Sequence, residues 1–213
     1  MTENQGAPQA LTAFFKSGPT DEIAQRLLGA KLSVGPLSGY IVETEAYLGE
    51  RDQAAHSYGG RHTKRSDPLY QEAGLVYVYQ IRTQFLLNFI AQAKNVPQGI
   101  LIRGVQPATG VTQMTANRHG KGGYDLTNGP GKLCQAFGID LKDNNVFVDR
   151  GRVCLSLTEH KKPAAITAAP RIGVPNHDEW TLAPLRFYVT GNPYVSQMRK
   201  RDMNLTTEGW QSK

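Results

Sequence analysis

The sequence contains very little cysteine and no long apolar run. Cys134 and Cys154 are the only cysteines among the 213 residues, and neither lies in a Cys-x-x-Cys pair. This usage argues against a disulfide framework or a zinc site and favours free thiols in a reducing compartment. No apolar run approaches the roughly 20 residues that cross a bilayer, and the stretch from Met1 to Ala13 lacks the pattern of a signal peptide. We therefore expect a cytoplasmic protein with no bound metal and no membrane partner.

The chain also lacks any sign of a second domain. Its length suits a single buried core, and it contains no linker, internal repeat or shift in composition. We predict a flexible segment over residues 1–11 and a single domain over residues 12–213. A monomer is the default expectation.

Positive charge is in excess. The chain has 24 Lys and Arg against 18 Asp and Glu, a net charge of +6 and a pI near 9.3. Such a balance suits a polyanionic partner, because each cation that neutralises a phosphate releases counterions, although solubility alone explains it equally well. Basic residues gather over 61–65 and 199–201. In the first group, Arg61 and Lys64 are candidates for contact with a phosphate backbone.

Short strands outnumber helices in the pattern of the sequence. Helices are expected over 21–30, 111–117 and 128–137, the first capped by Thr20 and the last by Asn128. Strands are expected over 31–34, 40–48, 75–81, 85–90, 100–105, 146–148, 153–157, 165–172 and 185–189. A tight turn at Arg82-Thr83 would join 75–81 and 85–90 in a hairpin. Because strands and helices do not alternate regularly, we predict a mixed α/β (α+β) fold with a largely antiparallel sheet.

The expected strand over 40–48 carries the most informative side chains. Glu43, Glu45 and Tyr47 project from the same face, because alternate residues of a strand share a face. Two nearby acids repel, which raises the pKa of the more buried one, as a general acid or base requires. The alternative is that these residues lie on a solvent-exposed strand face, which is the commoner position for glutamate side chains.

Three further residues have ordinary explanations when each is taken separately. His56 lies in a polar loop, where histidines are usually surface residues, and Tyr79 alternates with Tyr77 along a strand, where aromatic residues usually pack. Arg103 is a single charge inside an apolar strand. A buried arginine needs a carboxylate partner, which Glu45 or Glu43 could supply.

Six segments together resemble the alkyladenine (3-methyladenine) DNA glycosylases of the bacterial type. They follow the family's order and spacing from about residue 12 to about residue 196. The matching segments are Ile41 to Gly60, Tyr77-Val78-Tyr79, Leu101-Ile102-Arg103, Gly129 to Ala136, Pro170 to Val174 and Pro184 to Val189.

This resemblance implies a fold, an activity and a catalytic pair. The fold is one domain around a curved, mainly antiparallel sheet flanked by helices, similar to the C-terminal domain of formyltransferases. The activity is base excision repair: the enzyme flips an alkylated or deaminated purine out of double-stranded DNA and hydrolyses its glycosidic bond, without metal or cofactor. Glu45 would activate the attacking water and Arg103 would help to hold it. The expected location is the nucleoid of a bacterial cytoplasm.

The resemblance also implies how the base is held. Tyr47 and His56 would stack on one face of the flipped base and Tyr79 on the other. Backbone groups of Ala54 and His56 would meet the edge of the base, and Asn88 would check its identity. These residue types suit an alkylated purine, which is often cationic and is attracted to aromatic faces.

The chain departs from the family in the hairpin after Tyr79. There the family has a second tyrosine that fills the gap left in the duplex, whereas this chain reads Gln80-Ile81-Arg82-Thr83-Gln84. Counting from Tyr79 places Arg82 in the wedge position, and counting from Asn88 places Ile81 there. An apolar wedge is the more usual kind, so both assignments stay open, with Arg82 slightly favoured.

Lys132 raises the question of a lyase activity, because a lysine near a glycosidic carbon can form a Schiff base. Its place in the first turn of an expected helix favours a phosphate contact instead. Two other readings of the chain remain: a lesion-binding protein without catalysis, and a module that binds RNA or tRNA. Glu45 and Arg103 argue against the first, and a competition between lesion duplex and tRNA separates the second.

Overall fold

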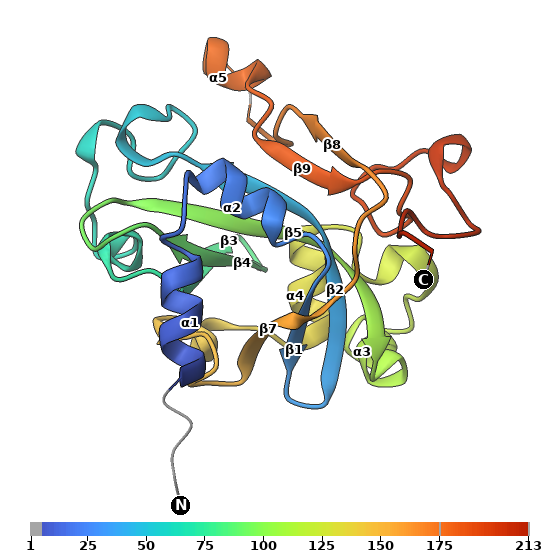
Figure 1. Ribbon diagram of the computed structural model, residues 1–213. Coiled ribbons are helices and arrows are strands. Elements are labelled where there is room, and N and C mark those ends of the chain that lie inside the picture. Colours follow the sequence, from blue (N-terminus) through green and yellow to red (C-terminus); the bar gives the residue numbers. More distant parts are fainter. Residues whose placement is uncertain (1–5, 175, 213) are drawn as a thin grey trace, which may run out of the picture.

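The computed structural model describes residues 6–174 and 176–212, which are built around a nine-stranded antiparallel sheet (Figure 1). The main path of the sheet runs β6-β3-β4-β5-β2-β1-β7, and β9 joins it by pairing with β2 and β8. The strands are β1 Ala30–Val34, β2 Leu37–Tyr47, β3 Leu75–Ile81, β4 Gln84–Ala91, β5 Gln98–Thr109, β6 Val146–Phe147, β7 Val153–His160, β8 Ile166–Ala169 and β9 Arg186–Val189. The predicted α+β class, the curved antiparallel sheet and the single domain are confirmed. The likeness to the formyltransferase domain stays a prediction.

Strand β2 is the centre of the sheet. One edge pairs with β5 along most of its length, and the other edge pairs first with β1 and then with β9. The register with β5 shifts around Glu43, which marks an irregularity in the ladder. Because strands flank both edges and chain covers both faces, Val42, Thr44 and Ala46 are buried together with Glu43 and Glu45.

The helices are α1 Gly6–Phe14, α2 Thr20–Arg26, α3 Val111–Asn117, α4 Pro130–Phe137 and α5 Glu179–Leu182. Short 3₁₀ turns occupy Gly49–Arg51, Tyr58–Gly60, Asp67–Tyr70, Gly123–Leu126, Leu141–Asp143 and Lys200–Asp202. Helix α1 begins inside the segment expected to be flexible, and residues 1–5 of that segment lie outside the described residues. Helices α2 and α4 pack on the sheet, the first against β2 and the second against β4 and β5.

Both predicted helix caps are wrong. Pro19 precedes α2, and Thr20 lies inside the helix with its hydroxyl donating to Gln98 Oε1 at 2.6 Å. Gly129 precedes α4, and the Asn128 side chain accepts from Lys132 Nζ at 2.9 Å. In both cases the side chain that was expected to cap the helix forms a hydrogen bond with another side chain instead.

Helix α2 also ends before residue 30, where the sequence predicted its end. Gly29 has a φ of +94°, and a Cβ added there would lie 1.8 Å from the carbonyl oxygen of Lys161. Only glycine fits this close approach, and β1 starts at the next residue.

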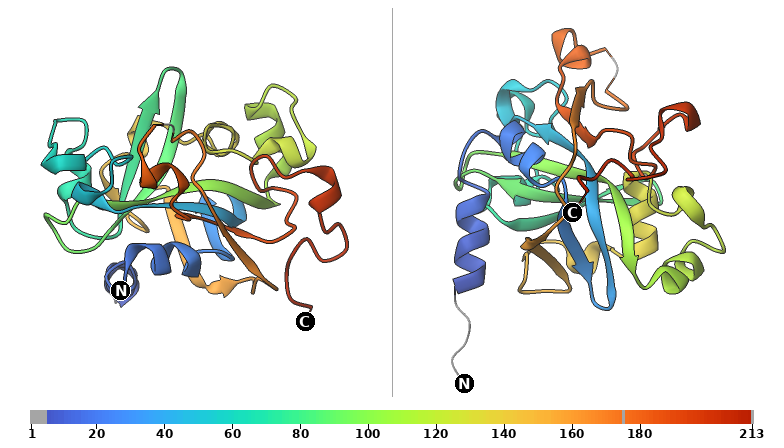
Figure 2. Two further views of the ribbon diagram at one scale, coloured as in Figure 1. Left: turned by 90° about the horizontal axis from the view of Figure 1, so that it is seen from above. Right: turned by 45° about the vertical axis from the view of Figure 1, so that its right-hand side comes forward.

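The predicted hairpin is confirmed as β3 and β4. Ile81 pairs with Gln84, so the connection has two residues, Arg82 and Thr83. Arg82 adopts a φ of +52°, which is uncommon for a residue with a side chain. The hairpin projects from the body of the molecule (Figure 2), and its tip, Ile81 to Gln84, is exposed.

No helix among the described residues is long and apolar enough to span a membrane. The main core cluster lies between the sheet and helices α2 and α4, and Phe15, Phe89 and Phe137 are among its largest buried side chains. Cys134 and Cys154 are both free thiols, as the sequence predicted.

Candidate active site

The Glu45 carboxylate is completely buried and is held by two hydrogen bonds and one ion pair. Tyr47 Oη donates to Oε2 at 2.9 Å, and the backbone N–H of Ile172 donates to Oε1 at 2.8 Å. Arg103 Nη1 lies 3.3 Å from Oε1. The solvated strand face, which was the alternative interpretation of this segment, is therefore excluded: Glu45 and Glu43 are each 0% exposed.

The pKa of Glu45 is raised above that of an ordinary carboxyl. Burial is the largest cause, and Arg103, the Ile172 N–H and the Tyr47 hydroxyl oppose it by stabilising the charged form. Repulsion from Glu43, which the sequence suggested as the cause, is the smallest of the contributions. Burial, and not the charge of Glu43, is therefore the main reason that the pKa of Glu45 is raised.

Glu43 and Arg103 belong to one buried cluster of charges. Glu43 accepts from Arg186 Nη1 at 2.9 Å and from the backbone N–H of Ser196 at 2.8 Å. Arg103 lies between the two acids, with its Nε 3.5 Å from Glu43 Oε1. The cluster therefore contains two carboxylates and two guanidinium groups, so its acidic and basic side chains are equal in number.

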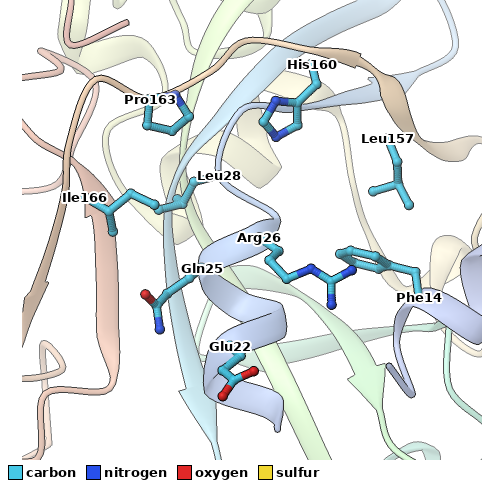
Figure 3. Close-up of a pocket in the computed structure, with 9 residues that line it drawn as sticks. All are labelled: Phe14, Glu22, Gln25, Arg26, Leu28, Leu157, His160, Pro163 and Ile166. Atoms are coloured by element: carbon cyan, nitrogen blue, oxygen red, sulfur yellow. The ribbon is translucent and has the colours of Figure 1, made fainter. Parts of the chain in front are cut away.

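A cavity of about 310 Å³ lies beside this cluster. Its wall contains seven residues that the sequence singled out: Tyr47, Ala54, His56, Tyr79, Ile81, Asn88 and Arg103. A larger hollow of about 730 Å³ lies between α2 and the chain from β7 to β8 (Figure 3), and none of the predicted site residues lines it. The smaller cavity is the candidate site because the predicted site residues line it, although the other hollow is larger.

His56 and Tyr79 lie against each other in the cavity wall. Their ring centroids are 4.0 Å apart, and the guanidinium carbon of Arg65 lies 3.9 Å from the Tyr79 centroid. Although His56 as a residue is exposed, its ring is partly desolvated by this packing. Burial lowers the pKa of His56, and the positive charges of Arg65 and Arg61 lower it further. A base ring does not fit between His56 and Tyr79 as they stand, so the expected sandwich requires one ring to move.

Asn88 presents only its carbonyl oxygen to the cavity. Its Nδ2 donates to the backbone oxygens of Tyr77 at 3.1 Å and Leu86 at 3.2 Å. Because both amide protons are used, Oδ1 is left as an acceptor for whatever enters. This orientation suits a check on the edge of a base.

A buried ion pair ties the site together. Arg171 donates to both oxygens of Asp52, at 2.6 and 2.9 Å, and to the carbonyl of Ala46 at 3.1 Å. Asp52 in turn accepts from the backbone N–H groups of Leu48 and Ala54. The Arg171 guanidinium carbon lies 4.7 Å from the Tyr47 ring centroid. This pair fixes strand β2, the loop after it and the segment that carries Ile172.

The residues expected to meet DNA lie in different settings. Arg61 and Lys64 are exposed on the loop between β2 and β3. Lys132 is already paired, with its Nζ 2.5 Å from Asp125 Oδ1. Ile81 lines the cavity, whereas Arg82 occupies the exposed turn of the hairpin.

The sequence did not single out several residues of this site. The Asp52–Arg171 pair, Arg65 and His177 received no role, and His177 also lines the cavity. Asp52 and Arg171 each lie in one of the six resembling segments, Ile41 to Gly60 and Pro170 to Val174, and this was the available signal for the pair. The cavity wall is completed by Leu86, Leu101, Pro130, Ile172, Gly173 and Val174.

Comparison with known proteins identifies the family. The family described as methylpurine-DNA glycosylase matches residues 13–193. A protein of Staphylococcus carnosus (strain TM300) is 46% identical over 200 residues, which cover 92% of this chain and 97% of that protein. A protein of Latilactobacillus sakei subsp. sakei (strain 23K) is 46% identical over 215 residues, covering 99% and 100%. A protein of Enterococcus faecalis (strain ATCC 700802 / V583) is 43% identical over 200 residues, covering 92% and 87%.

All three relatives carry a name that assigns them provisionally as 3-methyladenine DNA glycosylases. The family match spans most of the chain and includes every residue of the cavity wall. The chain therefore belongs to the methylpurine-DNA glycosylase family.

Proposed function

We propose that this protein removes alkylated purines such as 3-methyladenine and 7-methylguanine from double-stranded DNA, and neutral lesions such as hypoxanthine or ethenoadenine as well. It flips the damaged nucleotide into the cavity, hydrolyses the N-glycosidic bond with an activated water and leaves an abasic site. As a member of its family the protein is a monofunctional DNA glycosylase. The observation that carries the proposal is the buried Glu45 carboxylate, held by Tyr47, Ile172 and Arg103 beside an aromatic cavity.

The proposed reaction is a displacement at the sugar carbon that bears the base. As the bond from this carbon to the purine nitrogen breaks, its electron pair leaves with the base, and the sugar gains oxocarbenium character. The oxygen of a water molecule bonds to the carbon and gives a proton to Glu45. A raised pKa makes Glu45 a stronger base once it is ionised. Arg103, 3.3 Å from the carboxylate, is placed to keep it ionised and to orient the water.

Recognition of the base rests on uncharged aromatic faces. A cationic purine gains about 0.5–2 kcal/mol from each aromatic face that it stacks on. The lowered pKa of His56 keeps its ring neutral near pH 7, so the ring does not repel the cation. Because His56 and Tyr79 are in contact, we propose that Tyr79 swings aside when the base enters.

Arg61 and Lys64 are proposed to contact the DNA backbone, which they reach from an exposed loop. Lys132 is proposed to make a smaller contribution, because a phosphate contact has to compete with its pairing to Asp125. We expect a monomer that works where the DNA lies, on the nucleoid of a bacterial cytoplasm.

Chromatography of released bases tests the function. Duplexes containing 3-methyladenine, 7-methylguanine, hypoxanthine or ethenoadenine are incubated with the protein, and the free base and the abasic site are quantified. We expect release of the cationic bases at the least. The absence of any released base, or tighter binding to tRNA than to lesion duplex, contradicts the proposal.

Replacing Tyr47 by phenylalanine is predicted to shift the pH dependence of base release. The Tyr47 hydroxyl lowers the pKa of Glu45, so its loss raises that pKa further. Glu45 accepts a proton only when ionised, and release falls as the pH drops through its pKa. The acid limb of kcat/KM should therefore move to higher pH in Tyr47→Phe. Tyr70→Phe removes a hydroxyl bonded to the Arg61 carbonyl and serves as the matched control. An acid limb that stays in place in Tyr47→Phe counts against Glu45 as the base.

The hairpin tip is predicted to hold the duplex open through Arg82. Unstacking the flipped base costs a few kcal/mol, and a side chain that fills the gap in the duplex offsets part of that cost. Arg82→Ala removes this side chain, so it should lower the flipped fraction by about tenfold. The fluorescence of 2-aminopurine placed beside the lesion reports flipping. Thr83→Ala, in the same turn, is the control. If Ile81→Ala loses flipping and Arg82→Ala does not, Ile81 is the wedge.

A further inference from the structure

Release of a neutral damaged base requires a proton donor, whereas release of a cationic one does not. An alkylated cationic purine leaves as a neutral base when it takes the electron pair of the glycosidic bond. A neutral purine such as hypoxanthine would leave as an anion unless a group in the cavity gives it a proton. The inference below rests on the proposed function and asks which residue supplies that proton.

Most polar groups of the cavity wall are already engaged. Arg103 faces the two buried acids, and a guanidinium group does not give up its proton in proteins. Tyr47 donates its hydroxyl proton to Glu45, and Asn88 donates both amide protons to backbone carbonyls. Among the side chains that line the cavity, this leaves His56, Tyr79 and His177.

Two of these three are poor proton sources. His56 packs on Tyr79 and stands near Arg61 and Arg65, and its lowered pKa leaves it mostly neutral near pH 7. A phenol is in general a weak acid, and the Tyr79 ring is engaged by His56 and by the Arg65 guanidinium. Both rings are therefore suited to stacking.

His177 differs from them in its setting. It is half-buried and lines the cavity, and its backbone is anchored: its N–H donates to Thr181 Oγ1 at 2.9 Å and its carbonyl accepts from the Trp180 N–H at 2.9 Å. Its imidazole makes no hydrogen bond to any described part of the chain. The segment that carries it begins just after Ile172, whose N–H holds Glu45.

Charged or titratable groups lie on its own segment and on the facing parts of the cavity wall. Asp178 and Glu179 follow it on the same segment. From the sheet, Arg103 lines the cavity, and the buried Glu43 and Glu45 are paired with it. From the loop after β2, the facing group is His56. Histidine is also the side chain that exchanges a proton near neutral pH.

We propose that His177 is the group that protonates neutral purines as they leave. Its imidazolium N–H gives a proton to a ring nitrogen of the departing base while the glycosidic bond breaks and its electron pair goes to the base. The base leaves as a neutral molecule and His177 becomes neutral. Water adds its oxygen to the sugar carbon and its proton to Glu45. Solvent later returns a proton to His177 and removes one from Glu45.

Single-turnover release of hypoxanthine and of 7-methylguanine by His177→Gln tests this role. Glutamine keeps a hydrogen-bond donor but gives up no proton. We expect hypoxanthine release to fall by about 10²-fold or more, and to fall at least about tenfold more than 7-methylguanine release. The decline of hypoxanthine release at high pH should also disappear in the variant. His62→Gln, an exposed histidine paired with Asp67 outside the cavity, is the matched control.

Several outcomes overturn the assignment. Equal losses for the two bases would show a role in binding or folding alone, and no selective loss would show that another group supplies the proton. A selective loss in His56→Gln instead of His177→Gln would move the role to His56. A wild type that releases 7-methylguanine but no hypoxanthine also refutes the inference and leaves the proposed function standing. A wild type that releases neither base refutes the proposed function itself.

Discussion

Glu45→Gln is expected to slow base release by about 10²–10⁴-fold, the contribution typical of a positioned general base. Glutamine has nearly the same shape and can still accept the Ile172 N–H, which lies 2.8 Å from the carboxylate. It cannot take a proton from water, and it removes the negative charge that stabilises the developing oxocarbenium ion. Single-turnover release of 7-methylguanine under saturating enzyme measures the chemical step directly.

Glu43→Gln is the matched control for this prediction. Glu43 is equally buried and two residues away, but its hydrogen bonds come from Arg186 and the Ser196 N–H, which lie outside the cavity wall, and Arg103 is the one cavity group in the described part of the chain that is paired with it. Its replacement should lower stability and slow release far less than Glu45→Gln does. A Glu45→Gln protein that cleaves at the normal rate would remove Glu45 from the mechanism while leaving the activity intact.

Arg171→Met is expected to lower the free energy of unfolding by about 3–5 kcal/mol, because it leaves a buried carboxylate without its partner. Arg171 and Asp52 both have side chains that are 0% exposed, and two hydrogen bonds join them. The change also removes the donor to the Ala46 carbonyl. Urea unfolding followed by circular dichroism measures the loss.

A second variant separates the ion pair from simple packing. In Arg171→Met with Asp52→Leu no unpaired charge remains, so the double variant should lose less stability than the sum of the two single variants. Lys16→Met breaks the exposed pair with Glu72 and should change stability little. A loss below about 1 kcal/mol in Arg171→Met would mean that water reaches Asp52.

The sequence alone determined the secondary structure of the β3–β4 hairpin. A strand rich in β-branched and aromatic residues, followed by a tight turn, predicted the hairpin of β3 and β4, and the turn residues Arg82 and Thr83 lie where expected. Resemblance to a family went further, since Tyr47, His56, Tyr79 and Arg103 do line one cavity. Such a resemblance is informative because a family motif keeps together residue types that act at one site in the folded protein.

Only the tertiary structure decided what surrounds Glu45. By pattern it belonged to a strand face that solvent could cover, yet β9, the Ile172 segment and Arg103 enclose it completely. The partners of Glu43 and Glu45 lie far away in the sequence: Arg186 is 143 residues from Glu43, and Ile172 is 127 residues from Glu45. The same distance hid the Asp52–Arg171 pair and the place of His177 in the cavity wall. A local pattern states the period of a segment and the chemistry of its side chains. Which distant segment buries them, and so sets their pKa values and their free donors, is decided when the chain packs.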